Sequence, residues 1–264
     1  MRFFTFQPEG VENCEVAAFI QNKSSSRVVP AVVICPGGGY NMVSERESDP
    51  VAKEYFTAGY HVFVLTYSVG ARAKDFEPLC QLAATFIHIR KYANEWNVDK
   101  EKIAVCGFSA GGHLAGSLGT LYNEEKFQNV FGHKEDIRPD AMILCYPVIL
   151  ADEYAHQGSI KKVSGAEVGS PEYEWFSLEK HVDSTTPPTF LWHTATDTTV
   201  PVQNSLRMAN ALVEEKIPVE LHVFPEGPHG LSTCTREVGS ADSYVGRWVE
   251  WSIAWLAKIF EFHK

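Results

Sequence analysis

The sequence predicts an α/β domain with a mostly parallel sheet of about eight strands and helices on both faces. Apolar runs of strand length alternate with longer amphipathic stretches along most of the 264 residues. That length suits one domain, and we take residues 1–264 as a single unit. A third observation is one apolar run that passes through a glycine-flanked serine directly into a helical pattern. Parallel strands covered on both faces produce this alternation.

The predicted elements follow the chain in order. The first two strands form an antiparallel hairpin at a sheet edge, and the third is a continuous apolar run typical of a covered strand. Strands are predicted at Phe3–Phe6, Glu15–Ile20, Val28–Cys35, Tyr60–Tyr67, Ile103–Cys106, Ala141–Tyr146, Pro188–His193 and Val219–Phe224. Helices are predicted at Ser48–Ala58, Glu77–Trp96, Ala110–Tyr122, Pro201–Lys216 and Asp242–Phe262. Residues 150–187 lose this periodicity, which predicts a loop-rich insertion over the active site.

Composition excludes several classes of function. A net charge of -10 disfavours nucleic acid and anionic membranes as partners. The N-terminus lacks the apolar core of a signal peptide, and no apolar run approaches the roughly 20 residues that span a bilayer. Six cysteines without a C-x-x-C pair, among them Cys35, Cys106 and Cys145 in apolar runs, predict reduced buried thiols in a cytoplasmic protein. The oligomeric state stays open, and a homo-oligomer is compatible with the sequence.

The last predicted helix carries an aromatic stripe, which could indicate a membrane-binding face. The charges between the aromatic residues are of mixed sign, so we predict that the stripe packs on the core. The stripe consists of Trp248, Trp251, Trp255 and Phe260.

Ser109 is the predicted nucleophile. It stands in Gly107-Phe108-Ser109-Ala110-Gly111, between a strand pattern and a helix pattern. Glycine is needed on both sides because a Cβ would collide with the crossing backbone. The hydroxyl then lies at a helix N-terminus, where N–H groups favour a developing oxyanion. The alternative is an ordinary turn with a solvated serine, and the flanking strand and helix patterns argue against it.

His229 is the predicted general base. A serine hydroxyl needs a base to take its proton, and histidine is the usual choice. His229 lies in a Gly/Pro-rich loop just beyond a predicted strand, whereas His193 is the main rival and His181 the next. A metal site of these three histidines is the alternative, but no metal-ligand spacing supports it, and we expect neither metal nor cofactor. The other candidates are predicted to pack or to cap locally: His61, His88, His113 and His222.

Asp197 is the predicted partner of the base. It lies between the end of a predicted strand and the next helix, and a carboxylate there can fix the tautomer of a histidine. Its alternative role is to cap the helix, and Asp183 and Asp152 are the other candidates. The order serine, acid, histidine along the chain is that of α/β-hydrolases.

The glycine run Gly37-Gly38-Gly39 follows an earlier predicted strand. A loop in this place turns backbone N–H groups toward the oxyanion, so we expect the donors to be Gly38 or Gly39 together with Ala110. A phosphate-binding loop is the alternative, but the Lys-Ser/Thr pair of a P-loop is missing.

These segments together resemble the acetyl-xylan and feruloyl esterase branch of the α/β-hydrolases, which includes proteins called lipase/esterase or xylanase-associated hydrolases. The resemblance runs from about residue 28 to the C-terminus and implies the α/β-hydrolase fold. Pro36 stands where hormone-sensitive-lipase-like enzymes carry histidine, so the likeness to those lipases is more distant. The matching segments are Pro36–Tyr40, Gly107–Ala115, Pro187–His193, Asp197 with Val200-Pro201, and Gly227–Leu231.

The resemblance implies a serine carboxylesterase that removes short acyl groups, above all acetyl, from sugars or xylo-oligosaccharides through an acyl-enzyme. The expected partner is therefore a small ester, in particular of a carbohydrate. An aryl-formamidase or a dipeptidyl-type serine peptidase would use the same three residues. The alternative outside the enzymes is a homologue that binds a ligand without turning it over.

Overall fold

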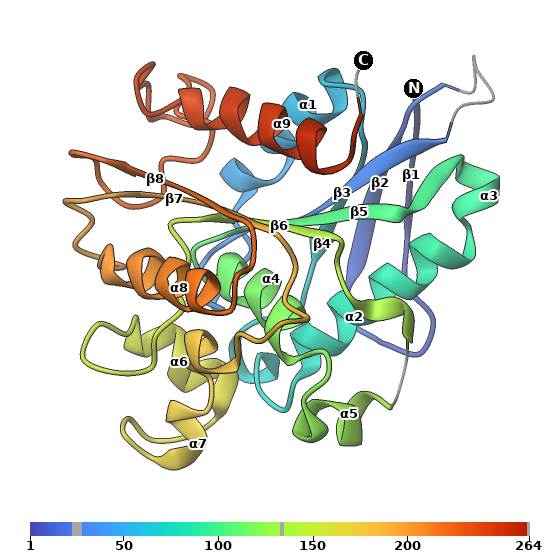
Figure 1. Cartoon of the computed structure of the whole chain (residues 1–264). Coiled ribbons are helices and arrows are strands. Elements are labelled where there is room, and N and C mark those ends of the chain that lie inside the picture. Colours follow the sequence, from blue (N-terminus) through green and yellow to red (C-terminus); the bar gives the residue numbers. More distant parts are fainter. Residues whose placement is uncertain (23–27, 133–134, 263–264) are drawn as a thin grey trace.

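The computed structural model describes residues 1–22, 28–132 and 135–262, which build an eight-stranded sheet between two layers of helices (Figure 1). The strand order is β1-β2-β4-β3-β5-β6-β7-β8. The prediction of about eight strands, mostly parallel, is therefore confirmed. The strands are β1 Arg2–Phe6, β2 Glu15–Ile20, β3 Val29–Cys35, β4 His61–Thr66, β5 Val98–Phe108, β6 Ala141–Cys145, β7 Thr189–Thr194 and β8 Val219–Phe224.

The first strands form the antiparallel edge of this sheet. β1 pairs antiparallel with β2, and β2 pairs antiparallel with β4, so the predicted edge hairpin is present. The other neighbouring strands pair in parallel. The carboxyl ends of β3, β5, β6, β7 and β8 consequently meet at one edge of the sheet, where ligands of open α/β sheets bind.

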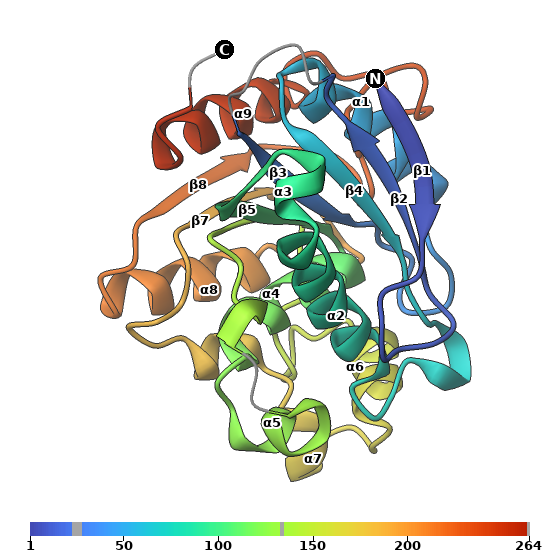
Figure 2. The ribbon, with the colours of Figure 1, turned by 90° about the vertical axis from the view of Figure 1, so that its right-hand side faces the viewer.

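The helices divide between the two faces of the sheet. α1 (Asp49–Thr57) and α9 (Arg247–Ile259) cover one face, whereas α2 (Glu77–Lys91), α4 (Ala110–Leu121) and α8 (Gln203–Glu214) cover the other (Figures 1 and 2). The shorter helices are α3 Ala93–Trp96, α5 Glu125–Phe131, α6 Gln157–Ser164 and α7 Pro171–Glu174, with 3-10 turns η1 Glu45–Glu47, η2 Gly70–Arg72, η3 Glu135–Ile137 and η4 Leu178–His181.

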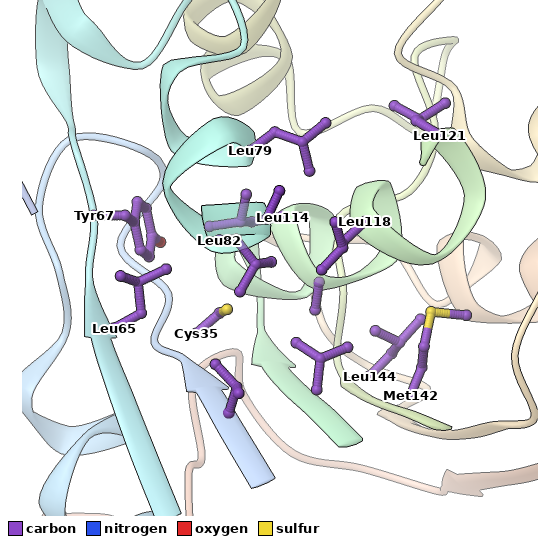
Figure 3. Packing of buried hydrophobic residues seen from close by; sticks show 14 of the residues in the cluster. Cys35, Leu65, Tyr67, Leu79, Leu82, Leu114, Leu118, Leu121, Met142 and Leu144 are labelled. Carbon is purple, nitrogen blue, oxygen red and sulfur yellow. The ribbon is translucent and has the colours of Figure 1, made fainter. Parts of the chain in front are cut away.

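Each face has its own apolar core. On the α4 side, Leu114 and Leu118 pack over the sheet with Leu82 of α2 and Leu144 of β6 (Figure 3). On the other side the aromatic stripe of α9 fills the core, because Trp248, Trp255 and Phe260 are buried and Trp251 is half-buried. Core packing of the stripe is therefore confirmed. Within the described residues, no helix combines the length and apolar character needed to cross a bilayer.

Two predicted helices differ from the structure. The helix predicted over 77–96 breaks at Tyr92, whose φ of −98° and ψ of 10° separate α2 from α3. The last helix begins at Arg247 rather than at Asp242, because the Asp242 carboxylate accepts hydrogen bonds from the N–H groups of Tyr244 and Val245 and so closes a turn first. The segment 150–187 is not only loop, since it contains α6, α7 and η4.

Candidate active site

Ser109 stands on the turn between β5 and α4 with strained backbone angles, φ 53° and ψ −119°. The two flanking glycines allow this turn. A Cβ on Gly107 would lie 2.2 Å from the carbonyl oxygen of Gly111, and one on Gly111 would lie 2.1 Å from that of Cys35. The prediction that only glycine fits here is confirmed. The N–H of Ser109 donates to the carbonyl of Cys145 at 3.0 Å, which anchors the turn to β6.

His229 follows β8 and contacts the serine. Its Nε2 lies 2.8 Å from Ser109 Oγ, and its Nδ1 lies 2.6 Å from Asp197 Oδ2. Ser109 is 7% exposed, and the His229 side chain is 17% exposed, so both remain reachable from solvent. The three residues that the sequence singled out are therefore brought into one hydrogen-bonded chain, although up to 120 positions separate them along the sequence.

Asp197 is buried as an ion. Its Oδ1 accepts hydrogen bonds from the N–H groups of Thr199 at 2.9 Å and Val200 at 3.0 Å. Burial alone would raise the pKa of this carboxyl, but hydrogen bonds from His193 and His229 hold the pKa well below its usual range. The predicted alternative role of Asp197 also has a basis, because the two N–H groups belong to the turn that leads into α8.

The hydrogen bonds define the tautomer of His229. An ionised carboxylate can only accept, so Nδ1 carries the proton that is shared with Asp197. Nε2 is then an acceptor and faces the hydroxyl of Ser109. This arrangement can remove the serine proton and return it to a leaving group.

The rival histidines are bound elsewhere. His193 is fully buried, its Nε2 donates to the carbonyl of Val200 at 2.8 Å, and its Nδ1 lies 2.8 Å from Ser205 Oγ. Its Nε2 also lies 3.5 Å from Asp197 Oδ2, the oxygen that His229 contacts, so His193 is a second neighbour of the acid. His181 contacts Glu124 and the carbonyl of Trp175 instead. Over the described ranges, no three His, Cys, Asp or Glu side chains are arranged to hold a metal ion.

The alternative acids also lie in other interactions. The carboxylate of Asp152 pairs with Arg207, and that of Asp183 accepts from the N–H of Thr185 at 2.7 Å. Neither is a hydrogen-bond partner of His229 in the described structure.

The glycine loop after β3 lines the same cleft as Ser109. Gly37 does not face the cleft with its N–H, because that group donates to Glu47 Oε2 at 2.7 Å. Gly38 has φ 127°, and a Cβ there would lie 2.2 Å from the carbonyl oxygen of Met42. Within the described part of the chain, no acceptor binds the N–H of Gly38, Gly39 or Ala110. These three groups are thus available to a ligand.

The cleft beside Ser109 has a volume of about 450 Å³. Most of its described lining side chains are of polar residue types, with Met42 as the one large apolar side chain, although apolar atoms make up the larger part of the lining surface. The polar side chains besides the serine and the base are Ser44, Arg46, Glu47, His156 and Thr199.

Sequence reasoning missed Glu47, Tyr146 and His156. Glu47 lies in the segment Ser44-Glu45-Arg46-Glu47-Ser48, which has the composition of an exposed polar turn. In the structure Glu47 is only 4% exposed. The single available signal was its position shortly after the glycine loop. His156 fell in the segment without periodicity, so no pattern assigned it to the cleft.

Comparisons with known proteins decide the family. The BD-FAE family profile matches residues 18–212. The chain belongs to the BD-FAE family. It is 39% identical over 223 residues to endo-1,4-beta-xylanase B of Butyrivibrio fibrisolvens, which covers 83% of this chain, and 29% identical over 234 residues to the acetylxylan esterase of Xylanibacter ruminicola, which covers 86%. It spans only 35% and 46% of the lengths of these two curated relatives.

Solved structures agree with this BD-FAE assignment. An acetyl ester-xyloside bifunctional hydrolase from Caldicellulosiruptor lactoaceticus superposes with a TM-score of 0.83 at 36% identity, covering 95% of this chain and 89% of that one. The carboxylesterase Cest-2923 from Lactobacillus plantarum reaches a TM-score of 0.87 at 25% identity, covering 98% of both chains. The predicted α/β-hydrolase fold and the resemblance to acetylxylan esterases are confirmed, and the relatives support the prediction of a carboxylic ester hydrolase.

Proposed function

We propose that this chain is a serine carboxylesterase that removes short acyl groups, acetyl first, from sugars or xylo-oligosaccharides. The observation that carries the proposal is the hydrogen-bonded chain from Ser109 through His229 to Asp197, in which Ser109 and His229 line one cleft. Relatives named acetylxylan esterase and acetyl ester-xyloside hydrolase support the substrate class. No cofactor is needed for this chemistry.

In the proposed reaction Ser109 Oγ attacks the ester carbonyl while His229 Nε2 takes the hydroxyl proton. The tetrahedral oxyanion accepts hydrogen bonds from Ala110 and from Gly38 or Gly39. His229 then gives its proton to the departing alcohol oxygen, and the acyl group remains on Ser109 as an ester. Water, activated by the same imidazole, attacks that ester and releases the carboxylic acid. Asp197 stabilises the imidazolium in both steps.

Residues 150–187 are proposed to cover the cleft in part, because His156 from this segment lines it. All six cysteines are unpaired, and five of them are buried, which supports a reducing compartment such as the cytoplasm.

The test is Ser109→Ala against exposed Ser243→Ala as matched control. We expect Ser109→Ala to lose at least about a thousand-fold in kcat/KM on p-nitrophenyl acetate and to resist a fluorophosphonate probe, while Ser243→Ala behaves as wild type. Near-normal hydrolysis by Ser109→Ala would refute the mechanism. Lack of probe labelling in the wild type would indicate a binding protein without turnover.

A substrate panel separates the enzymes that share this machinery. We expect acetylated xylo-oligosaccharides to be hydrolysed faster than N-formylkynurenine or peptide anilides. Preference for the formyl amide or for the anilides would replace the esterase by an aryl-formamidase or a peptidase.

A further inference from the structure

Glu47 is a buried carboxylate that forms no ion pair in the described part of the chain. An uncompensated carboxylate in the interior is unfavourable, so its oxygens must find good donors. Both do. Oε2 accepts from the N–H of Gly37 at 2.7 Å, and Oε1 accepts from the hydroxyl of Tyr146 at 2.7 Å.

Tyr146 connects Glu47 to the histidine loop, residues 225–246, which lies between β8 and α9 and holds His229. Because the carboxylate can only accept, the Tyr146 hydroxyl must donate to Glu47, and its oxygen accepts from the N–H of Ser232 at 2.9 Å. The ring of Tyr146 also packs against the ring of His229, edge to face, with centroids 5.0 Å apart. The donors therefore point in one direction, from the histidine loop through Tyr146 to Glu47.

Arg46 binds the histidine loop at two further points. Its guanidinium donates to the carbonyl of Gly230 at 2.7 Å, directly after the base, and to Ser240 Oγ at 2.9 Å. Its own carbonyl accepts from the Ser232 hydroxyl at 2.5 Å. Two residues of the 3-10 turn η1 thus join it to the loop of His229, Arg46 directly and Glu47 through Tyr146.

The other end of this turn holds the glycine loop. The carbonyl of Gly37 accepts from the N–H of Ser44 at 2.9 Å, and its N–H is taken by Glu47. Gly37 also lies against the nucleophile turn, since a Cβ there would lie 3.1 Å from Cβ of Ser109. Because Gly37 directly precedes Gly38 and Gly39, these hydrogen bonds also position the N–H groups of those two residues.

We propose that Glu47 is a positioning residue that sets the distance between the oxyanion donors and the base, an inference that rests on the proposed esterase function. Its two oxygens connect the glycine loop to the histidine loop. The donors of the first loop and the base of the second must keep a fixed distance to stabilise the transition state. Asp197 and Ser109 hold His229 independently of Glu47. Loss of Glu47 therefore displaces the glycine loop relative to the serine, and the effect falls on the transition state rather than on substrate binding.

The experiment compares Glu47→Gln with Glu45→Gln, an exposed glutamate of the same turn. The amide keeps the shape but cannot accept from both donors. For Glu47→Gln we expect kcat on p-nitrophenyl acetate to fall about 10- to 100-fold with KM within about two-fold, and a trifluoromethyl ketone to bind more weakly by a similar factor. Glu45→Gln should match the wild type in all three.

Tyr146→Phe provides the second variant. It breaks the link to Ser232 but leaves the bond between Glu47 and Gly37 in place, so kcat should fall less than in Glu47→Gln. If Glu47→Gln does not fold, a Tyr146→Phe protein with wild-type kcat overturns the proposal. A folded Glu47→Gln with unchanged kcat, or with raised KM alone, overturns it too. Either result leaves the esterase function standing, because that function fails only if Ser109→Ala stays active.

Discussion

The two carboxylates that the described chain buries, Asp197 and Glu47, lie on the same cleft and are stabilised in different ways. Asp197 has two histidines beside it, one of which can become a cation during catalysis. Glu47 has a backbone N–H and a phenol, both neutral. The acid that must respond to a moving proton is paired with a titratable ring. The acid that we propose to position two loops is paired with groups that stay neutral.

The largest effect in this comparison should come from Asp197→Asn. The asparagine amide lets His229 place its proton on Nε2, where it can no longer accept from Ser109. We expect kcat/KM on p-nitrophenyl acetate to fall by about 10⁴, well beyond the loss for Glu47→Gln. Steady-state kinetics of the two purified variants at one pH measure the difference.

Asp183→Asn is the control for that substitution, because Asp183 is exposed and lies in a separate turn. It should retain wild-type activity. If Asp197→Asn kept more than about a tenth of the activity, the acid would not act through the tautomer of His229. The two carboxylates would then not differ in their roles as described above.

Lowering the pH should reduce folding stability through His113, a buried neutral ring, and through Asp197, a buried ion, in different pH ranges. His113 is fully buried, and burial lowers its pKa to about 4, although its bond to the carbonyl of Phe176 opposes that shift. The unfolded chain binds a proton at His113 below about pH 6.5, so folding stability falls by up to about 3 kcal/mol between pH 6.5 and 4. Asp197, with its lowered pKa, stabilises the fold above about pH 4 and loses that contribution only below it.

Urea unfolding at several pH values between 7.5 and 4 tests this separation. His113→Gln should reduce the slope between pH 6.5 and 4 without removing it, because burial also lowers the pKa of His61 to about 4. A His113→Gln curve with the same slope as the wild type would show that His113 is not buried as a neutral ring.

The two carboxylates also mark what the sequence could predict. Asp197 was found because it follows a strand with a clear apolar pattern, and parallel strands bring such positions to one edge. His229 was found for the same reason, and Ser109 was found from its two flanking glycines between a strand pattern and a helix pattern. Glu47 could not be found, because its burial comes from two loops that fold over it, and loop conformation leaves no periodic pattern. The break at Tyr92 and helix α6 were missed because both depend on local backbone angles and tertiary contacts.

The smallest expected effect concerns His156, which lines the cleft from segment 150–187. Its Nδ1 lies 2.8 Å from the hydroxyl of buried Ser159, which has no other acceptor within the described residues and so donates. Nε2 then carries the proton. Burial lowers the pKa of His156, so the ring is neutral at pH 7 and can donate to a sugar oxygen. Unlike either carboxylate, it should bind substrate.

We therefore expect His156→Ala to raise KM for acetylated xylo-oligosaccharides by about two- to ten-fold, the value of one neutral hydrogen bond, without changing kinetics on p-nitrophenyl acetate. Lys161→Ala, at an exposed position of α6, is the control. Equal losses on both esters would mean that His156 supports the cleft as Glu47 does. Because p-nitrophenyl acetate lacks sugar hydroxyls, the ratio of the two KM values separates a residue that contacts the substrate from one that positions the machinery.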